Sequence, residues 1–207
     1  MFLKKISFKT MSSFEGIVLD IDNTLIYSVF LTKDQSENED ETKIDFSVEK
    51  LQGLQKLECY PISIQSYDKK EEYNIEVYFR PYLKEFISLI FKKYKVGLWS
   101  LGKKEYVNKI AELLNIGTDT INPKAQYKAS FIYNWNDCHR ENYTITKPLS
   151  KSPFKSIKAF IIEDRFDVCD KNDSCVIVDD FEGDPEDVIL KLLISQITNY
   201  KDLTIPI

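Results

Sequence analysis

Two carboxylates one residue apart, Asp20 and Asp22, directly follow an apolar run at residues 16–19. Such a short aliphatic run is typical of a buried strand in a parallel sheet. Open α/β sheets bind ligands beyond the carboxyl ends of their strands, where these acids would lie. The two charges repel unless one is protonated or a cation lies between them. Mg²⁺, bound by carboxylates and phosphate oxygens, meets that requirement, whereas an Asp-rich turn without chemistry is the alternative.

Polar residues also follow three later apolar runs. Ser100 ends the run at 96–100, Glu163 and Asp164 follow 159–162, and an acidic pair at 179–180 follows 175–178. These runs predict further buried strands. Amphipathic stretches alternate with them, which indicates a parallel, helix-flanked sheet of the α/β class.

Three helices are predicted to cover that sheet. One opens at Arg80-Pro81 because proline is favoured at the first helical position, and a second covers about residues 104–114 and buries Tyr106. The last starts at Asp184-Pro185 and directs Val188, Leu192 or Leu193, and Ile197 to the core. Between them, 130–133 favours a strand and 134–143 a loop.

The segment at about residues 30–78 differs from the rest of the chain in composition. It contains a strongly acidic run at 34–43, typical of a solvated loop, and two β-prone runs at 57–65 and 73–80. We therefore expect a small insert with an acidic loop and a β-hairpin after the first strand. Residues 1–207 are expected to form one domain around it.

The composition excludes several classes of protein. With 207 residues, 43% hydrophobic and 29% charged, the chain is typical of a globular domain, and its net charge of −5 argues against broad binding to nucleic acids or anionic membranes. No apolar stretch is long enough to cross a bilayer. Four cysteines without a C-x-x-C pair and a single histidine, His139, indicate no zinc site and no disulfide framework. We expect reduced cysteines and a cytoplasmic or nuclear protein, of unknown oligomeric state.

The pattern Asp-x-Asp-x-Thr-Leu at 20–25 resembles the nucleophile motif of the haloacid-dehalogenase phosphatases. Its longer form, through Ser28, is similar to the subfamily that dephosphorylates the carboxy-terminal domain of RNA polymerase II. Arg80-Pro81 before a helix and Ser100 after a strand resemble further landmarks of that family. The resemblance implies a three-layer Rossmann-like fold with a parallel central sheet and a small β insert.

Two family motifs leave a choice among residues. The resemblance assigns the phosphate-binding lysine to Lys147, with Lys151, Lys155 and Lys158 as competitors. It assigns the metal-binding acidic pair to Glu163-Asp164 and not to the pair at 179–180, because a Phe-x-Gly-Asp-Pro segment directly follows the latter. Pro148, Glu163 and the Arg-Phe pair at 165–166 depart from the family pattern.

The resemblance also implies a role for each site residue. Asp20 would attack phosphorus to form an aspartyl-phosphate, and Asp22 would act as general acid and base. Thr24 completes the motif and counts among the catalytic group. Mg²⁺ would be held by the Asp20 carboxylate, the Asp22 carbonyl and Asp164.

Three more side chains would complete that site. Ser100 and Lys147 would hydrogen-bond the equatorial phosphate oxygens, where charge develops in the transition state. Glu163 would orient the waters of the metal, or Lys147, from behind.

These roles predict a Mg²⁺-dependent phosphatase of phosphoserine and phosphothreonine in proteins. A phosphatase of small metabolites or nucleic-acid ends, or a protein-interaction module without activity, are the alternatives. A short insert would leave the site open to an extended peptide. Residues 60–64 would then form a shallow pocket, and Lys103, Lys104 and Arg140 would attract flanking phosphates, unless these residues only pack the hairpin and solvate the surface.

Overall fold

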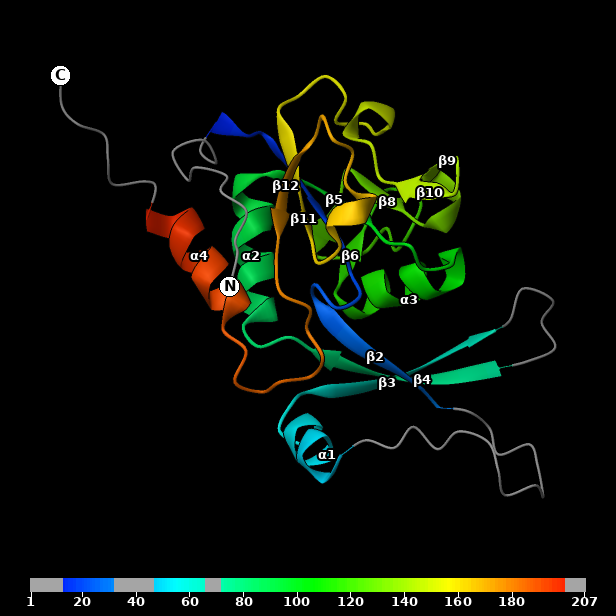
Figure 1. The fold of residues 1–207 in the computed structure, drawn as a ribbon, viewed down its shortest axis with the longest axis vertical. Coiled ribbons are helices and arrows are strands. Elements are labelled where there is room, and N and C mark those ends of the chain that lie inside the picture. Colours follow the sequence, from blue (N-terminus) through cyan, green and yellow to red (C-terminus); the bar gives the residue numbers. More distant parts are fainter. Residues whose placement is uncertain (1–12, 32–46, 66–71, 200–207) are drawn as a thin grey trace.

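A parallel sheet forms the centre of the computed structural model, which describes residues 13–31, 47–65 and 72–199 (Figure 1). All neighbouring strands of the sheet are parallel, which confirms the predicted α/β class. Its five strands run in the order β12 (Ser174–Ile177), β11 (Ala159–Glu163), β1 (Gly16–Leu19), β5 (Lys95–Trp99) and β8 (Phe131–Tyr133).

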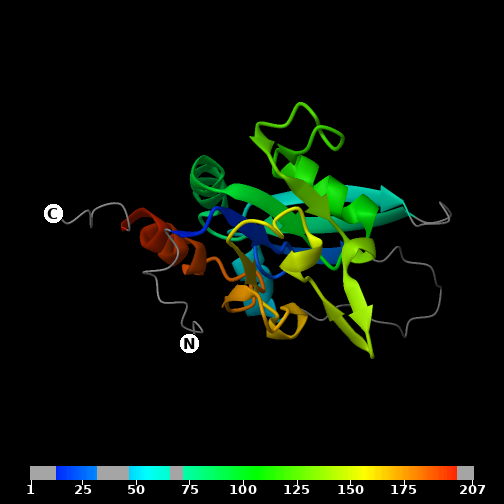
Figure 2. The ribbon, with the colours of Figure 1, turned by 90° about the horizontal axis from the view of Figure 1, so that it is seen from above.

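The two faces of this sheet are covered differently. Side chains alternate along a strand, so Ile17 and Leu19 of β1 face α2 (Leu83–Lys93), α3 (Lys104–Leu113) and α4 (Ile189–Asn199). Val18 faces the other way, where Leu149 and Phe154 pack on it from an irregular segment that contains η3 (Leu149–Lys151). Figure 2 shows α2 and α3 on one side of the sheet and the hairpin of β9 (His139–Glu141) and β10 (Thr144–Thr146) on the other.

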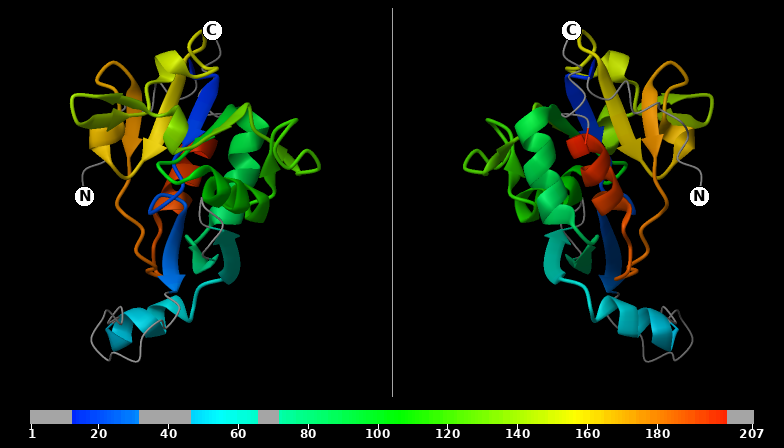
Figure 3. Two further views of the ribbon diagram at one scale, coloured as in Figure 1. Left: turned by 90° about the vertical axis from the view of Figure 1, so that its right-hand side faces the viewer. Right: turned by 90° about the vertical axis from the view of Figure 1, so that its left-hand side faces the viewer.

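A second sheet and one helix lie between β1 and α2 in the sequence. The sheet is antiparallel, and its order is β2 (Ile26–Leu31), β4 (Glu72–Phe79) and β3 (Cys59–Gln65). Figure 3 shows α1 (Val48–Leu54) beyond this sheet, away from the central one. The β-prone runs correspond to β3 and β4, whereas β2 and α1 are additions to the hairpin that the sequence predicted. The acidic run at 34–43 lies outside the described residues.

Two helices begin later than predicted. Pro81 lies in a turn and α2 begins at Leu83, after Tyr82 in a left-handed conformation with φ of 66°. Asp184-Pro185 likewise forms a turn, and α4 begins at Ile189, whose N–H donates to Asp187 Oδ1 at 2.9 Å. Proline thus lies in the turn before the helix at both sites and not at the first helical position. Val188 precedes the helix and is 45% exposed, so its predicted core position is wrong.

Residues 134–143 form regular structure where a loop was predicted. They include η2 (Trp135–Asp137) and β9, which pairs with β10 in an antiparallel hairpin. The turn between these strands contains Asn142 and Tyr143, both with positive φ. Hydrogen bonds between the two backbones form this hairpin, and they do not require apolar side chains. The hairpin therefore shows only a weak apolar pattern in the sequence. A short parallel pair, β6 (Ile116–Gly117) and β7 (Tyr127–Lys128), follows α3.

The prediction of four reduced cysteines is wrong. A disulfide joins Cys169 and Cys175, while Cys59 and Cys138 are free thiols. The two bonded residues flank a turn between η4 (Phe166–Val168) and β12, and the turn brings together sulfurs that are six positions apart. A search for C-x-x-C spacing overlooks this arrangement. The cytoplasmic or nuclear compartment therefore stays a prediction that has lost one of its premises.

Within the described ranges, no helix combines the length and the apolar character needed to span a bilayer.

Candidate active site

Asp20 and Glu163 lie side by side at the carboxyl edge of the central sheet. Leu19 is aligned with Ile162 in the parallel pairing of β1 and β11, so the next residues, Asp20 and Glu163, are also neighbours. The Asp20 N–H donates to Ile162 O at 3.0 Å. The chain runs from β1 to β5 and β8 on one side and later to β11 and β12 on the other. Such a reversal of strand order is where open α/β sheets bind ligands.

Lys147 joins these two acids. Its Nζ lies 2.6 Å from Glu163 Oε2 and also contacts Asp20 Oδ1, and its side chain is fully buried. The Lys147 N–H donates to Val168 O at 2.8 Å, which ties this segment to η4. The structure thus brings Lys147 to Asp20, whereas Lys151, Lys155 and Lys158 are exposed.

Asp164 completes an acidic cluster. Carboxylate oxygens of Asp20, Glu163 and Asp164 all lie within 4.8 Å of one another. Thr24 is fully buried, and its hydroxyl donates to Asp164 Oδ1 at 2.8 Å. Thr24 therefore orients Asp164, an acid of this cluster.

The cluster contains three carboxyl groups and one ammonium. Burial raises the pKa of Asp20 against the opposing effect of Lys147, and burial and Asp20 raise the pKa of Glu163. Burial lowers the pKa of Lys147, but Asp20 and Glu163 outweigh it and raise that pKa overall. One ammonium faces three carboxylates, so a divalent cation at Asp20 and Asp164 would remove much of this repulsion. Hard oxygen ligands of this kind fit Mg²⁺.

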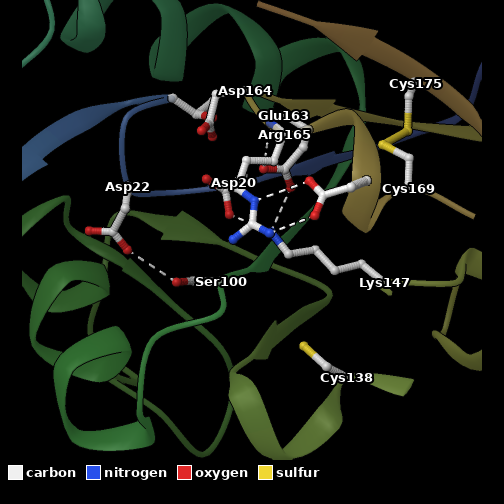
Figure 4. Close-up of polar contacts among 12 residues, drawn as sticks. Asp20, Asp22, Ser100, Cys138, Lys147, Glu163, Asp164, Arg165, Cys169 and Cys175 are labelled. Atoms are coloured by element: carbon white, nitrogen blue, oxygen red, sulfur yellow. Dashed lines mark hydrogen bonds and ion pairs between the residues drawn. A yellow bond between two sulfur atoms is a disulfide. The ribbon is translucent and has the colours of Figure 1, made fainter. Parts of the chain in front are cut away.

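Asp22 points away from the cluster. Figure 4 shows it turned toward Ser100, whose hydroxyl donates to Asp22 Oδ2 at 3.3 Å. The phenol of Tyr106 donates to Asp22 Oδ1, and Ser28 Oγ lies 2.7 Å from the same phenol oxygen. Burial raises the pKa of Asp22, while the hydrogen bonds from Tyr106 and Ser100 lower it. A raised pKa favours the protonated form that a general acid requires.

Arg80 binds the loop that follows β1. Its buried guanidinium donates to Thr24 O at 2.9 Å and to Asp179 O at 2.8 Å, and it binds both carboxylate oxygens of Asp187 at 2.9 and 2.8 Å. The N–H of Phe181 donates to Asn23 O at 2.6 Å, close to the same guanidinium. These contacts fix the tight loop in which Asn23 takes a positive φ of 56°.

The remaining candidates lie away from the cluster. Asp179 and Asp180 are exposed, and Asp179 reaches the site only through its carbonyl, which Arg80 binds. Lys103 and Lys104 are exposed at the start of α3. The guanidinium of Arg140 lies 4.5 Å from the ring of Trp135 and donates to its carbonyl at 2.7 Å.

A cavity of about 420 Å³ opens beside Asp22. It lies between the small antiparallel sheet and the start of α3, and Asp22 forms part of its wall. Its other lining residues are mostly apolar or aromatic: Phe30, Ile64, Gln65, Tyr73, Leu101, Gly102, Lys103, Glu105 and Tyr106. Of the predicted pocket at 60–64, only Ile64 lines it, because Tyr60 packs on Phe79 with ring centroids 4.5 Å apart.

Sequence analysis overlooked two residues of this site. The sequence predicts Tyr106 in the core of a helix, and it places Arg80 at the start of a helix and among the landmarks of the family, without a role in the site for either side chain. A signal for Arg80 does exist in the sequence, because this arginine ends the β-prone run 73–80. An arginine buried at the end of a strand requires several hydrogen-bond acceptors, which predicts that other segments gather around it. The phenol of Tyr106 leaves no such signal, since tyrosine is common on the apolar face of a helix.

Comparisons with known proteins bear on the family and the fold of the chain. A sequence model described as NLI interacting factor-like phosphatase matches residues 16–203. Among solved structures, a single-substitution variant of the fission yeast RNA polymerase II CTD phosphatase Fcp1, bound to beryllium fluoride, is similar to this chain with a TM-score of 0.59. It is 17% identical, and the match covers 91% of this chain and 51% of that one.

A second structure of Fcp1, described as an essential RNA polymerase II CTD phosphatase, has a TM-score of 0.56 and 17% identity. That match covers 93% of this chain and 50% of the other. The chain thus spans about half the length of the structures it matches, and at this identity they establish the fold alone. A comparison with curated protein sequences found no match. Because the family model covers nearly the whole chain, the protein belongs to the NLI interacting factor-like phosphatase family, on a haloacid-dehalogenase fold.

Proposed function

We propose that this chain is a phosphatase of phosphorylated proteins that works through a covalent bond from phosphate to Asp20. The observation that carries the proposal is the contact of the buried Lys147 ammonium with the Asp20 carboxylate at the end of β1. A nucleophilic carboxylate next to a cation at a strand end is suited to bind and attack a phosphate ester. Membership of a phosphatase family supports the same reaction.

The acidic cluster suits a magnesium ion. Asp20 and Asp164 would supply carboxylate oxygens and Asp22 its backbone carbonyl, while Glu163 is already engaged with Lys147 at 2.6 Å. When bound, the ion supplies charge neutralisation for the phosphate oxygens. Lys147 and the Ser100 hydroxyl would donate hydrogen bonds to other oxygens of the same phosphate.

Asp20 and Asp22 have separate roles in this reaction: Asp20 is the nucleophile, and Asp22 transfers the protons. The Asp20 carboxylate attacks phosphorus as the bond to the ester oxygen breaks, and Asp22 gives its proton to that oxygen. Asp22 then takes a proton from water, whose oxygen attacks phosphorus. The bond to Asp20 breaks, and inorganic phosphate leaves with Asp22 protonated again.

The cavity beside Asp22 supports a protein substrate. Its apolar wall of Phe30, Ile64 and Tyr73 would accept a side chain next to the phosphorylated residue, and it adjoins the residue that protonates the leaving oxygen. A phosphoserine or phosphothreonine peptide fits such an open surface better than a metabolite, which enzymes usually enclose. The CTD phosphatases of similar fold act on a protein, which points in the same direction.

A comparison of phosphate esters tests the proposal. Hydrolysis of 4-nitrophenyl phosphate is measured with and without Mg²⁺, followed by kcat/KM for phosphoserine peptides, free phosphoserine, sugar phosphates and phosphorylated oligonucleotides. The peptides are expected to be the best of the physiological esters. Equal or better rates on small molecules or nucleic-acid ends would replace the peptide assignment.

The nucleophile is tested by Asp20→Asn, with Asp180→Asn at the exposed strand end as the matched control. Asp20→Asn should remove turnover without loss of folding, and Asp180→Asn should retain it. Asp22→Asn should lower the rate about 10²- to 10⁴-fold, the usual contribution of a general acid or base. A wild-type chain that binds phosphopeptides but turns over no ester would instead be an interaction module.

A further inference from the structure

We infer that Tyr106 is a positioning residue that orients the carboxyl group of Asp22, so that Asp22 can transfer a proton to the leaving oxygen. This role rests on the function proposed above and adds a residue to it. The phenol of Tyr106 donates to Asp22 Oδ1, and only 5% of Tyr106 is exposed. It approaches Asp22 from α3, whereas Asp22 itself lies in the loop after β1.

The carboxylate of Asp22 is held at both of its oxygens. Tyr106 binds Oδ1, and the Ser100 hydroxyl donates to Oδ2 at 3.3 Å. Ser100 also accepts the Gly102 N–H at 2.8 Å and is the hydroxyl proposed to donate to phosphate. When Ser100 turns its single proton to phosphate, Tyr106 becomes the side chain that keeps the plane of the Asp22 carboxylate fixed.

A third hydroxyl orients the phenol. Ser28 Oγ lies 2.7 Å from the Tyr106 oxygen, and Ser28 belongs to β2. Asp22 is therefore held directly from α3 and from the loop after β5, and β2 acts on it only through the phenol of Tyr106. A general acid must lie within hydrogen-bond reach of the atom it protonates, and a misplacement of about 1 Å costs about 100-fold in rate.

The ring of Tyr106 has a second neighbour. It lines the cavity beside Asp22 and lies against Phe30, with ring centroids 6.2 Å apart. Tyr106→Phe keeps this ring and removes only the hydroxyl. The substitution therefore tests orientation of the acid alone. We expect kcat to fall because the hydroxyl that orients Asp22 is lost, and KM to stay unchanged because the ring that lines the cavity is retained.

The test measures how the loss depends on the leaving group. Wild type, Tyr106→Phe and Asp22→Asn are compared on 2,4-dinitrophenyl phosphate, 4-nitrophenyl phosphate and a phosphoserine peptide. The quantity is kcat/KM, which reports steps up to the first release of product. A dinitrophenolate leaves without a proton, whereas a serine alkoxide requires one.

For Tyr106→Phe we expect a loss of about 10- to 100-fold with the phosphoserine peptide, carried by kcat, and little change with dinitrophenyl phosphate. For Asp22→Asn the loss in kcat/KM should depend even more steeply on the leaving group. Ser28→Ala should show a weaker dependence. Tyr127→Phe is the matched control, because Tyr127 packs on Phe91 and should leave all three rates unchanged.

An equal loss on all esters, or no loss, would overturn the role of Tyr106 while leaving the phosphatase intact. A flat profile for Asp22→Asn would remove the acid and this role with it. Absence of turnover by the wild type on every ester would overturn the proposed function itself. Thermal unfolding of Tyr106→Phe within a few degrees of wild type shows that a rate change does not come from loss of folding.

Discussion

Two neighbouring strands end in acidic pairs, and only one pair reaches the site. Glu163 is the last residue of β11 and Asp164 follows it, whereas Asp179 and Asp180 lie just beyond the end of β12. Glu163 is 2% exposed and bound to Lys147, whereas both acids after β12 are exposed. The strands differ in position, since β11 pairs with β1 and β12 lies at the edge of the sheet. The order of strands thus decides which of the two acidic pairs lies next to Asp20.

The largest effect is expected when the ammonium of Lys147, which Glu163 binds, is removed. Lys147→Met leaves Asp20 and Glu163 buried without their ammonium, and loss of one partner of a buried ion pair costs about 3–5 kcal/mol. Chemical denaturation should show this loss in free energy of unfolding, together with loss of turnover. Lys155→Met, at an exposed position, should stay within about 0.5 kcal/mol of wild type. Equal stability of the two variants would show that Lys147 is not bound to these acids.

The second test compares the second acid of each pair. Asp164→Ala should lower kcat/KM about 100- to 1,000-fold and raise the Mg²⁺ concentration for half-maximal rate, because an oxygen of the acidic cluster is lost. Asp180→Ala should stay near wild type. Titration of activity with Mg²⁺ after treatment with a chelator measures both effects. The reverse ranking would assign the metal to the end of β12.

The third test compares the first acid of each pair. Glu163→Gln keeps the shape but removes a charge from Lys147, and groups that orient a ligand from behind typically contribute about 10- to 100-fold. Asp179→Asn should change little, since only the carbonyl of Asp179 binds Arg80. Steady-state kinetics at saturating Mg²⁺ distinguish the two. A similar loss in both variants would mean that overall negative charge, not contact with Lys147, is responsible.

The smallest expected effect concerns the connection between the two strands. Cys169 and Cys175 close a short loop there, and a disulfide across so few residues contributes about 2 kcal/mol. Cys175→Ser should lower the free energy of unfolding by this amount, while Cys59→Ser, at an exposed free thiol, serves as control. Equal midpoints in urea would show that the bond contributes nothing to stability.

The fold was predictable because its signals are local and strong. Apolar runs at β1, β5, β11 and β12 are short, aliphatic and bounded by polar residues, and α3 has a clear amphipathic period. Lys147 and Asp164 could be selected from their competitors only through resemblance to a family. Spacing along the chain does not tell which of several lysines a loop returns to the sheet.

Other features depend on contacts across long separations. The hydroxyl of Tyr106 is bound to Asp22, 84 positions away, and nothing in a helical pattern distinguishes this tyrosine from a core residue. The starts of α2 and α4 were placed too early because proline favours turns as well as first helical positions. The disulfide was not predicted because a turn brings its two cysteines together, and their spacing matches no recognised cysteine motif.

The contacts of Arg80 have a consequence for the order of synthesis. This one guanidinium joins the loop at Thr24, the end of β12 at Asp179, and Asp187 before α4. Thr24 is synthesised more than 150 residues before Asp187, the last of the groups that hold its loop through Arg80. The loop after β1 therefore cannot gain all of its contacts before residue 187 has been synthesised, and a nascent chain that ends before this residue lacks the carboxylate that neutralises Arg80.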